Sequence, residues 1–267
     1  MDTADHPDPY LQAYQTAFQP ELEAAVRSYQ LPNGARVLDS PCGDGFYAAL
    51  FARHLQTGTL VAADISSARL GRARSTVRPA SPHLAIEFAE ADAYSLPFED
   101  DSFDLVWCAQ SFITLDDPVR ALKEIARVLR PGGRVAVLET DEYHHVLLPW
   151  SVGLELAVQR AVREEYRVRF GTGGKFAQAR WLRPGFLDAG LTPIGKRTLV
   201  ADRAAPFGPA EREFLARHLD YLREFVRMEL TPREMEELDR ASDPESLLNS
   251  LDAELTCLAT ISHADKK

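Results

Sequence analysis

Residues 36–45 have the types and spacing of a turn that binds a small ligand. Residues 36–39 are predicted to form a short apolar strand that ends in Asp39, and the next six residues form a turn punctuated by Gly43 and Gly45. Such a turn, followed by a helix, brings backbone N–H groups against a ligand, and glycine removes side chains that would block close approach. The segment is therefore predicted to bind a small-molecule cofactor.

Two kinds of cofactor are compatible with the spacing of this turn. Gly43, Gly45 and Ala48 fit the loose glycine fingerprint of dinucleotide-binding proteins, and Asp64 lies at a suitable distance for a ribose contact. A nicotinamide-dependent oxidoreductase is therefore one alternative. However, four acids are predicted around the crevice, and together they would repel a pyrophosphate. These acids are Asp39, Asp44, Asp64 and Asp92.

The acids suit a ligand that carries ribose hydroxyls, an ammonium group and a sulfonium, as S-adenosylmethionine does. The segment from Arg36 to Glu139 also resembles the class I S-adenosylmethionine-dependent methyltransferases, especially the group related to the ubiquinone and menaquinone methyltransferases. Pro41 stands where the commonest family pattern has its first glycine, a change that we expect the turn to tolerate. The matching pieces, in the family's order, are residues 37–45, 61–66, 91–93 with 96–98, 102–106 and 129–134.

The resemblance implies how the cofactor would be held. Asp64 would accept hydrogen bonds from both ribose hydroxyls, Ile65 would pack on the adenine, and Asp92 would accept a hydrogen bond from the adenine amino group. Asp39 and the backbone after the fourth strand would face the methionine part, and a helical segment with Tyr14 would fold over the cofactor as a lid. The predicted cofactor-binding residues are Tyr14, Asp39, Ser40, Pro41, Gly43, Gly45, Asp64, Ile65, Asp92, Ala93, Cys108, Ala109 and Gln110. No metal site is predicted.

Methyl transfer from a sulfonium is an in-line displacement with an activated donor. The protein must mainly hold the nucleophile about 3 Å from the methyl carbon in a dry site. A base is needed only if the nucleophile arrives protonated, and His144 and His145, just past the fifth predicted strand, are the candidates for it. Neighbouring side chains point in different directions, so we expect at most one of the two to face the crevice.

The predicted reaction is methyl transfer to a small organic acceptor, with O-methylation slightly preferred over C- or N-methylation. Methyl transfer leaves no obligatory catalytic motif in a sequence. A catalytically silent, cofactor-binding regulatory protein is therefore a further alternative to an enzyme.

Strands and helices alternate between residues 36 and 139 in a pattern typical of βαβ units and a parallel sheet. We therefore predict an α/β, Rossmann-like, doubly wound sheet of seven strands, mostly parallel with the last strand antiparallel, and with helical cap insertions. The predicted strands are 36–38, 59–63, 85–89, 103–109, 134–139, 194–201 and 255–262. The predicted helices of the core are 47–55, 67–75 and 118–130.

The whole chain, residues 1–267, is predicted to be a single methyltransferase domain. We expect an N-terminal helical lid over 1–34, a cofactor-binding core over 35–140 and a helical substrate cap over 141–190. Residues 206–250 are expected to be a helical insertion before the last strand, with helices at 211–229 and 232–241. This insertion would act as a cap or an oligomer contact, which leaves a homodimer open.

The composition excludes several classes of partner. The formal net charge of −10 argues against nucleic acid, because a phosphate backbone is normally met by a basic face. No run of eighteen apolar residues occurs, so no membrane span is expected, and the acidic N-terminus is unlike a signal peptide. The three cysteines, Cys42, Cys108 and Cys257, form no CxxC pair, which is consistent with a cytoplasmic protein.

Overall fold

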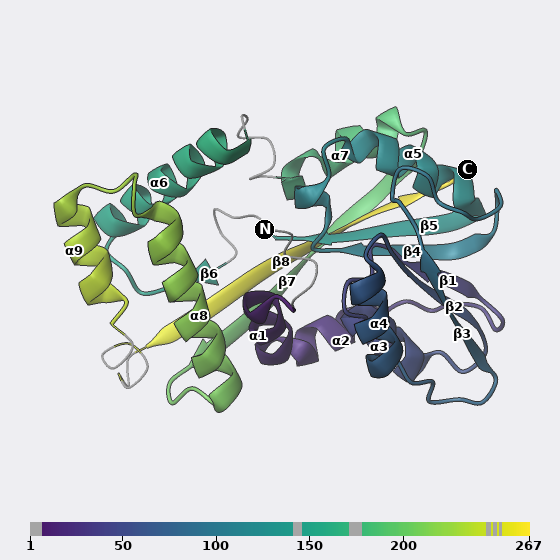
Figure 1. Cartoon of the computed structure of the whole chain (residues 1–267), viewed down its shortest axis with the longest axis horizontal. Coiled ribbons are helices and arrows are strands. Elements are labelled where there is room, and N and C mark those ends of the chain that lie inside the picture. The colour runs from purple at the N-terminus through teal and green to yellow at the C-terminus, as the bar shows by residue number, and fades with distance from the viewer. Residues whose placement is uncertain (1–6, 141–145, 171–177, 244–246, 248–249, 251–252) are drawn as a thin grey trace.

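A computed structural model of the chain describes residues 7–140, 146–170, 178–243, 247, 250 and 253–267. A single sheet forms its centre (Figure 1). The strands are β1 (Arg36–Asp39), β2 (Gly58–Asp64), β3 (Leu84–Glu90), β4 (Phe103–Ala109), β5 (Leu129–Glu139), β6 (Val146–Leu147), β7 (Thr192–Ala204) and β8 (Glu254–Asp265). The helices are α1 (Pro9–Ala17), α2 (Gln19–Arg27), α3 (Phe46–His54), α4 (Ser67–Thr76), α5 (Pro118–Val128), α6 (Val152–Phe170), α7 (Gln178–Asp188), α8 (Pro209–Val226) and α9 (Pro232–Ala241).

Strand pairing confirms the predicted fold class. β1 pairs in parallel with both β2 and β4, β2 with β3, and β4 with β5, whereas β8 is antiparallel to β5 and to β7. The order of the strands reverses between β1 and β4. This is the switch point at which open α/β sheets bind their ligands, outside the carboxyl ends of the strands.

The predicted number of strands is wrong by one, because β6 adds a short eighth strand to the described part of the chain. Along β8, β5 pairs with the residues Thr260–Asp265 only, and β6 pairs with Thr256 and Cys257. Since β7 occupies the opposite edge of β8 over its whole length, β6 lies on the same edge as β5 and continues its line. β6 thus satisfies backbone groups on an edge that β5 leaves open.

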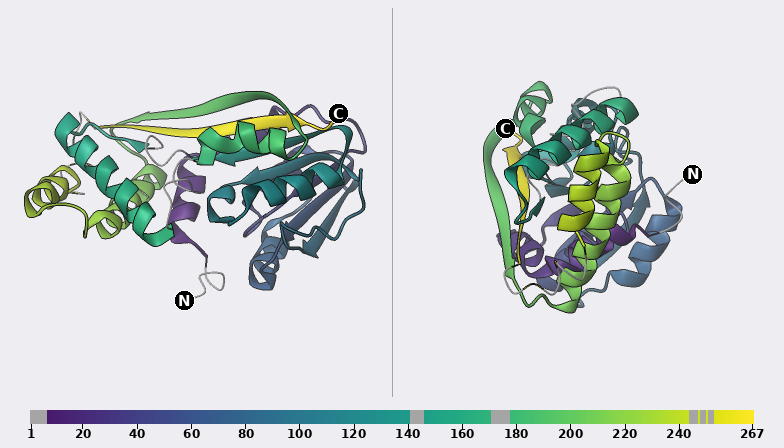
Figure 2. Two further views of the ribbon diagram at one scale, coloured as in Figure 1. Left: turned by 90° about the horizontal axis from the view of Figure 1, so that it is seen from above. Right: turned by 90° about the vertical axis from the view of Figure 1, so that its left-hand side faces the viewer.

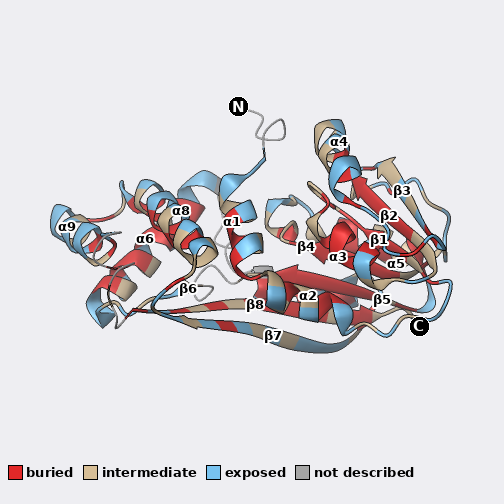
Figure 3. Cartoon of the chain, turned by 90° about the horizontal axis from the view of Figure 1, so that it is seen from below, coloured by how far each residue is buried: buried red, intermediate tan, exposed pale blue. Residues whose placement is uncertain are grey.

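Helices cover both faces of the sheet. α2, α3 and α4 contribute to the hydrophobic cluster on one face, and α5 and α7 contribute to the cluster on the other. Successive side chains of β4 point to opposite faces, so that Trp107 packs in the first cluster while Val106 and Cys108 pack in the second. Figure 3 shows the buried strands between these layers.

Three helices, α6, α8 and α9, form a separate group, which we call the cap cluster. They lie at the far end of the long β7–β8 ribbon, beyond the sheet (Figures 1 and 2). A third hydrophobic cluster holds them together, with Leu154 and Val162 of α6, Phe225 of α8 and Leu238 of α9 among its members. No helix among the described residues has the length and apolar composition needed to cross a membrane.

The stretch 141–190, expected as a single helical cap, divides in the structure. α6 belongs to the cap cluster, whereas α7 packs beside α5 on the sheet and buries Leu182 and Phe186 there. The insertion 206–250 holds α8 and α9. Thr231 begins α9 with a capping box, in which its hydroxyl accepts the Glu234 N–H and the Glu234 carboxylate accepts the Thr231 N–H.

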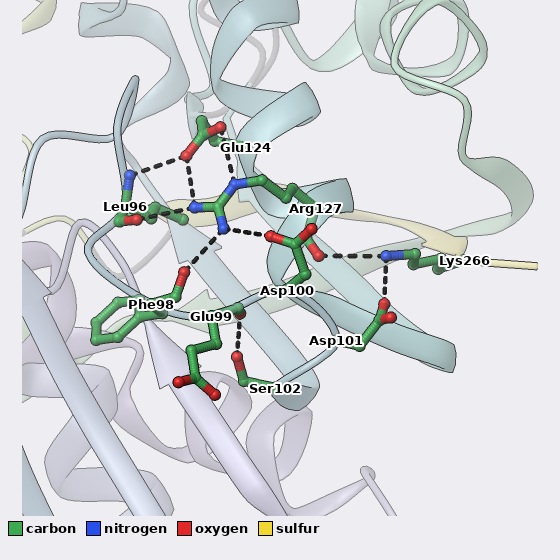
Figure 4. A network of polar contacts seen from close by, with 9 residues as sticks. All are labelled: Leu96, Phe98, Glu99, Asp100, Asp101, Ser102, Glu124, Arg127 and Lys266. Atoms are coloured by element: carbon green, nitrogen blue, oxygen red, sulfur yellow. Dashed lines mark hydrogen bonds and ion pairs between the residues drawn. The ribbon is translucent and has the colours of Figure 1, made fainter.

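An arginine fixes the long turn between β3 and β4 (Figure 4). Arg127 of α5 donates to the carbonyls of Leu96 and Phe98, each at 2.8 Å, and to the carboxylate of Asp100 at 2.8 Å. Glu124, one helical turn earlier, accepts from Nε at 3.1 Å and from Nη2, which also donates to Leu96, at 2.9 Å. The planar guanidinium thereby uses all three of its nitrogen atoms as donors, and it sets the path of the chain into β4.

Candidate functional site

The carboxyl ends of β1, β2 and β4 converge at the switch point. Two backbone hydrogen bonds tie the turn after β1 to its neighbours: Ser40 N–H donates to the Trp107 carbonyl at 3.0 Å, and Cys42 N–H donates to the Ala63 carbonyl at 2.8 Å. The turn then leads directly into α3. The local order of strand, turn and helix is therefore as the sequence predicts, and the turn is held from both sides.

Asp64 organises the crevice from the end of β2. Its side chain is 2% exposed, and it accepts the backbone N–H groups of Gly43 and Ser66, both at 2.9 Å. Each carboxylate oxygen keeps a second lone pair, so this arrangement leaves acceptor capacity for a pair of ribose hydroxyls. The next residue, Ile65, is 66% exposed, although it is a large apolar side chain. It therefore offers an open apolar surface beside the carboxylate, where an adenine ring would pack.

Asp39 is a buried carboxylate with no ion-pair partner in the part of the chain that the structure describes. It is 1% exposed, and neither of its oxygens has a hydrogen-bond partner of ordinary geometry among the described residues. Burial raises the pKa of Asp39 well above its ordinary value, the nearby Asp64 carboxylate raises it further, and the Ala48 backbone amide lowers it without offsetting the rise. A buried acid in this state is costly unless a positive group pairs with it. The ammonium and sulfonium of S-adenosylmethionine are such groups.

The two glycines of the turn have different roles. Gly43 adopts a φ of 53°, and a Cβ atom there would meet no atom within 4 Å, so its surface is open. Gly45 adopts a φ of 85°, but a Cβ atom there would lie 2.8 Å from the Ala73 Cβ of α4. Gly45 thus allows α3 and α4 to pack closely, and this contact, rather than an approach to the ligand, explains why glycine is needed there.

Asp44, expected as a fourth acid around the crevice, is neutralised by a neighbour. Its carboxylate accepts from the Arg72 Nε at 2.9 Å, on α4. Asp92 follows β3 and is exposed, with one oxygen accepting the Tyr94 N–H at 2.9 Å. Two of the four acids, Asp39 and Asp64, are therefore the buried ones.

The predicted residues after β3 and β4 meet those of the turn. A small hollow is lined by Ser40, Pro41, Ala93 and Cys108, together with the apolar side chains of Phe112 and its neighbours. These residues come from the carboxyl ends of β1, β3 and β4, beside the switch point. Ala109, the last residue of β4, is buried next to Cys108.

Two residues that shape the site, Tyr47 and Glu139, were not predicted from the sequence, whereas Gln110 was. Gln110 adopts a φ of 53°, and its Oε1 accepts a hydrogen bond of 3.3 Å from the hydroxyl of Tyr47 on α3. Glu139, at the end of β5, accepts the N–H groups of Ser111 and Phe112, at 2.9 and 2.7 Å. Together these contacts fix the loop that follows β4. An acid at the end of a buried strand was the signal for Glu139.

Tyr14 lies in a fixed helix. It is buried on α1, where it packs against Phe18 and against Phe214 of α8, and burial raises its pKa well above the ordinary value. Arg203 of β7 bonds the Glu21 carboxylate at 2.9 Å, which holds α2 to the ribbon. The described part of the expected lid, residues 7–34, is therefore packed against α8 and β7 in this structure.

The histidines expected as the base, His144 and His145, lie outside the described residues. The structure presents another imidazole, that of His218 on α8, which is 6% exposed. It lines a cavity between α6, α8 and the segment that begins with β6. We call this space the cap cavity. His218 follows Phe214 by four residues and shares its buried side of α8.

Comparison with known proteins places this site in a family. The sequence model described as a methyltransferase domain matches residues 38–137. The 2-phytyl-1,4-naphtoquinone methyltransferase of Synechococcus elongatus is 31% identical over 195 residues, which are 72% of this chain and 79% of that protein. The chain belongs to the class I S-adenosylmethionine-dependent methyltransferases. Matches to ubiquinone and menaquinone methyltransferases place it in their group, and S-adenosylmethionine is the cofactor of this family.

Other relatives in the family match over a shorter part. The methyltransferase GfsG of Streptomyces halstedii is 44% identical over 107 residues, and the chain covers 38% of its length. The chain thus spans less than half the length of the first curated relatives that it matches.

Solved structures share the methyltransferase fold. A proposed methyltransferase from Bacillus halodurans C-125 superposes with a TM-score of 0.58 at 18% identity, over 92% of this chain and 99% of that one. The [4+2]-cyclase SpnF superposes with a TM-score of 0.52 at 24% identity, over 92% of this chain and 79% of that one. At these identities the likeness shows the fold alone.

Proposed function

We propose that this chain transfers a methyl group from S-adenosylmethionine to a small organic acceptor. The observation that carries the proposal is the buried, uncompensated carboxylate of Asp39, which lies next to the organised carboxylate of Asp64 and the exposed Ile65. A cationic ligand with a ribose and an adenine satisfies all three. When bound, S-adenosylmethionine supplies a methyl group that its sulfonium activates. The sulfur atom leaves as a neutral thioether.

The chain's own residues bind, orient and exclude water. Asp64 orients the ribose through its remaining lone pairs, and Asp39 places negative charge at the methionine end, where the cation lies. The Tyr47 and Glu139 contacts hold Gln110 and the loop after β4 in one conformation. Such positioning supplies most of the catalysis in an in-line displacement, because the donor needs no further activation.

The acceptor atom is proposed to be oxygen, as expected from the sequence. Carbon is the second candidate, because several relatives are named ubiquinone/menaquinone biosynthesis C-methyltransferase. A quinone-type or other aromatic acceptor is proposed on the same ground. Mass spectrometry and NMR of the methylated product distinguish the two atoms, since an O-methyl and a C-methyl group differ in chemical shift.

If the acceptor arrives protonated, we propose that one imidazole of His144 and His145 removes the proton as the methyl group arrives. Replacing that histidine by alanine should lower the rate of methyl transfer by roughly a hundredfold or more, with little change in cofactor affinity. The acidic limb of the pH–rate profile should disappear as well. Wild-type rates in both single variants would show that neither imidazole acts as a base.

The proposal is tested by binding and by turnover. Isothermal titration calorimetry should detect S-adenosylmethionine and S-adenosylhomocysteine at micromolar concentrations but no binding of NAD. Binding of NAD alone would favour the oxidoreductase alternative. Radiolabelled methyl transfer to a panel of hydroxylated aromatic molecules tests the reaction. Cofactor binding without turnover of any acceptor would favour the regulatory alternative. The fold by itself does not fix the reaction, since a [4+2]-cyclase has it too.

A further inference from the structure

The cap cavity lies just beyond the cofactor crevice. β5 ends at Glu139, opposite Thr260 of β8, and β6 resumes opposite Cys257, three residues further along the same edge. At ~3.4 Å per residue, the wall of the cavity therefore begins about 10 Å past the end of β5. The crevice and the cavity are neighbours along one line of the sheet.

The cavity is walled by two helical stripes. α6 contributes Glu155, Val158, Gln159, Val162 and Tyr166, which share one face of the helix, and α8 contributes a similar stripe from His218 to Phe225. The centres of water molecules can occupy about 80 Å³ of the cavity, which is several times the volume that one water molecule needs on the same measure. No lysine or arginine is among the described lining residues, and Glu155 is acidic. An anionic ligand would therefore lack a counterion.

His218 lies in one wall of the cavity, and Tyr10 of α1 pairs with it. The Tyr10 hydroxyl lies 3.2 Å from His218 Nδ1, and the Tyr10 ring stacks on Tyr221 at a centroid distance of 5.4 Å. Tyr10 is one helical turn from Tyr14 on α1, and Tyr14 lies near Tyr47, whose hydroxyl bonds Gln110. This polar wall is thus the one that connects through α1 to the cofactor crevice.

On the basis of the proposed function, we propose that the cap cavity holds an uncharged, largely aromatic acceptor, and that the Tyr10–His218 pair hydrogen-bonds its hydroxyl group. The apolar walls bury the ring system, as hydrophobic and aromatic side chains do in ligand sites. The polar pair favours such an acceptor, because the hydroxyl can add a hydrogen bond to the pair that an analogue without the hydroxyl does not make. Tyr10 and His218 are thus specificity-determining residues.

The test measures binding of three probes to the full chain saturated with S-adenosylhomocysteine: 2-naphthol, naphthalene and 2-naphthoate. Quenching of Trp150, a lining residue, reports binding, and Trp181→Phe removes the exposed tryptophan from the signal. We expect 2-naphthol to bind about five- to tenfold more tightly than naphthalene, as for one buried hydrogen bond, and 2-naphthoate to bind more weakly than both. His218→Leu should abolish the preference for 2-naphthol, and Tyr10→Phe should reduce it.

Two further variants make the result decisive. Gln159→Leu removes a polar group from the opposite wall and should keep the preference. Val162→Trp should fill the cavity and abolish the binding of all three probes, while the affinity for S-adenosylhomocysteine stays unchanged. If that variant fails to fold, Val158→Phe takes its place. A preference that survives in His218→Leu, tight binding of 2-naphthoate, or probes that still bind to the filled cavity would overturn the proposal. Calorimetry with S-adenosylhomocysteine in the same samples tests the proposed function separately.

Discussion

Replacing Asp39 by asparagine should affect the free protein and its complex with opposite signs. The substitution keeps the shape of the side chain but removes a buried charge that has no hydrogen-bond partner of ordinary geometry among the described residues. An unsatisfied buried group costs about 1–3 kcal/mol, and more when it is charged. Since a domain of this size changes its Tm by ~2–4 °C per kcal/mol, we expect the Tm of the free variant to rise by roughly 2–12 °C.

The same substitution should weaken binding of the cofactor. A hydrogen bond to a charged group contributes about 1.5–3 kcal/mol, which corresponds to roughly ten- to 150-fold in affinity. A ligand stabilises the folded state by RT ln(1 + [L]/Kd), so the tighter-binding wild type gains more from the same ligand concentration. At a fixed millimolar concentration of S-adenosylmethionine, the Tm of the wild type should therefore exceed that of the variant. Differential scanning fluorimetry with and without ligand, and calorimetry, measure both effects.

The stability gain should also depend on pH. Because burial raises the pKa of Asp39 in the folded state, the folded wild-type protein binds the proton more tightly than the unfolded chain. Its free energy of unfolding therefore rises as the pH falls from the raised pKa of the folded state to the ordinary pKa of the unfolded chain. The advantage of Asp39→Asn should be full above the folded pKa and should disappear as the pH falls between these two values. Asp44→Asn, in the same turn but paired with Arg72, is the control and should change affinity less than twofold.

A variant that loses stability without ligand and binds S-adenosylmethionine like the wild type would refute this reasoning. It would mean that the Asp39 carboxylate is satisfied within the folded protein, and that the cation is bound elsewhere.

Three further predictions follow from the contacts. Gly45→Ala should destabilise the fold by about 2–4 kcal/mol in urea denaturation, because of its positive φ and its contact with α4, whereas Gly43→Ala, with open space around it, should cost about 1 kcal/mol. Arg127→Met should lower the free energy of unfolding by roughly 2–3 kcal/mol at pH 7. Because Arg127 lowers the pKa of Glu124, this difference from wild type should shrink as the pH falls below about 4.5 through that lowered pKa. An equal loss of stability at pH 3 would contradict the ion-pair explanation. Asp64→Ala should weaken binding of S-adenosylhomocysteine at least tenfold in calorimetry, and unchanged affinity with an intact fold would remove the ribose role.

The sequence predicted the order of strand, turn and helix around Asp39 because that information is local. The strand that ends in Asp39, the turn, and the pair Asp64 and Ile65 are each set by a few consecutive residues, and the parallel sheet brings such strand ends together. The alternation of strands and helices likewise fixed the fold class. The capped start of α9 at Thr231 could be read in the same way, from a threonine followed three residues later by a glutamate.

Features that depend on distant contacts could not be predicted in this way. The role of Gly45 requires knowledge of how closely Ala73 on α4 approaches it. The eighth strand depends on how far β8 extends past β5, since a two-residue strand has no periodicity to detect. Arg72 neutralises Asp44 from a different helix, so the count of acids around the crevice was too high.

The acceptor side is non-local throughout, and this explains why the substrate is the hardest property to infer. The Tyr10–His218 pair joins residues 208 positions apart, on helices from opposite ends of the chain. The β7–β8 ribbon makes the contact possible, because it carries α8 beyond the sheet to where α1 lies (Figure 1). Substitutions on α8 can therefore alter the proposed acceptor wall without touching the turn at Asp39 or Asp64. A conserved cofactor site and a variable acceptor are thus both compatible with one fold, and relatives that share only the core need not share the substrate.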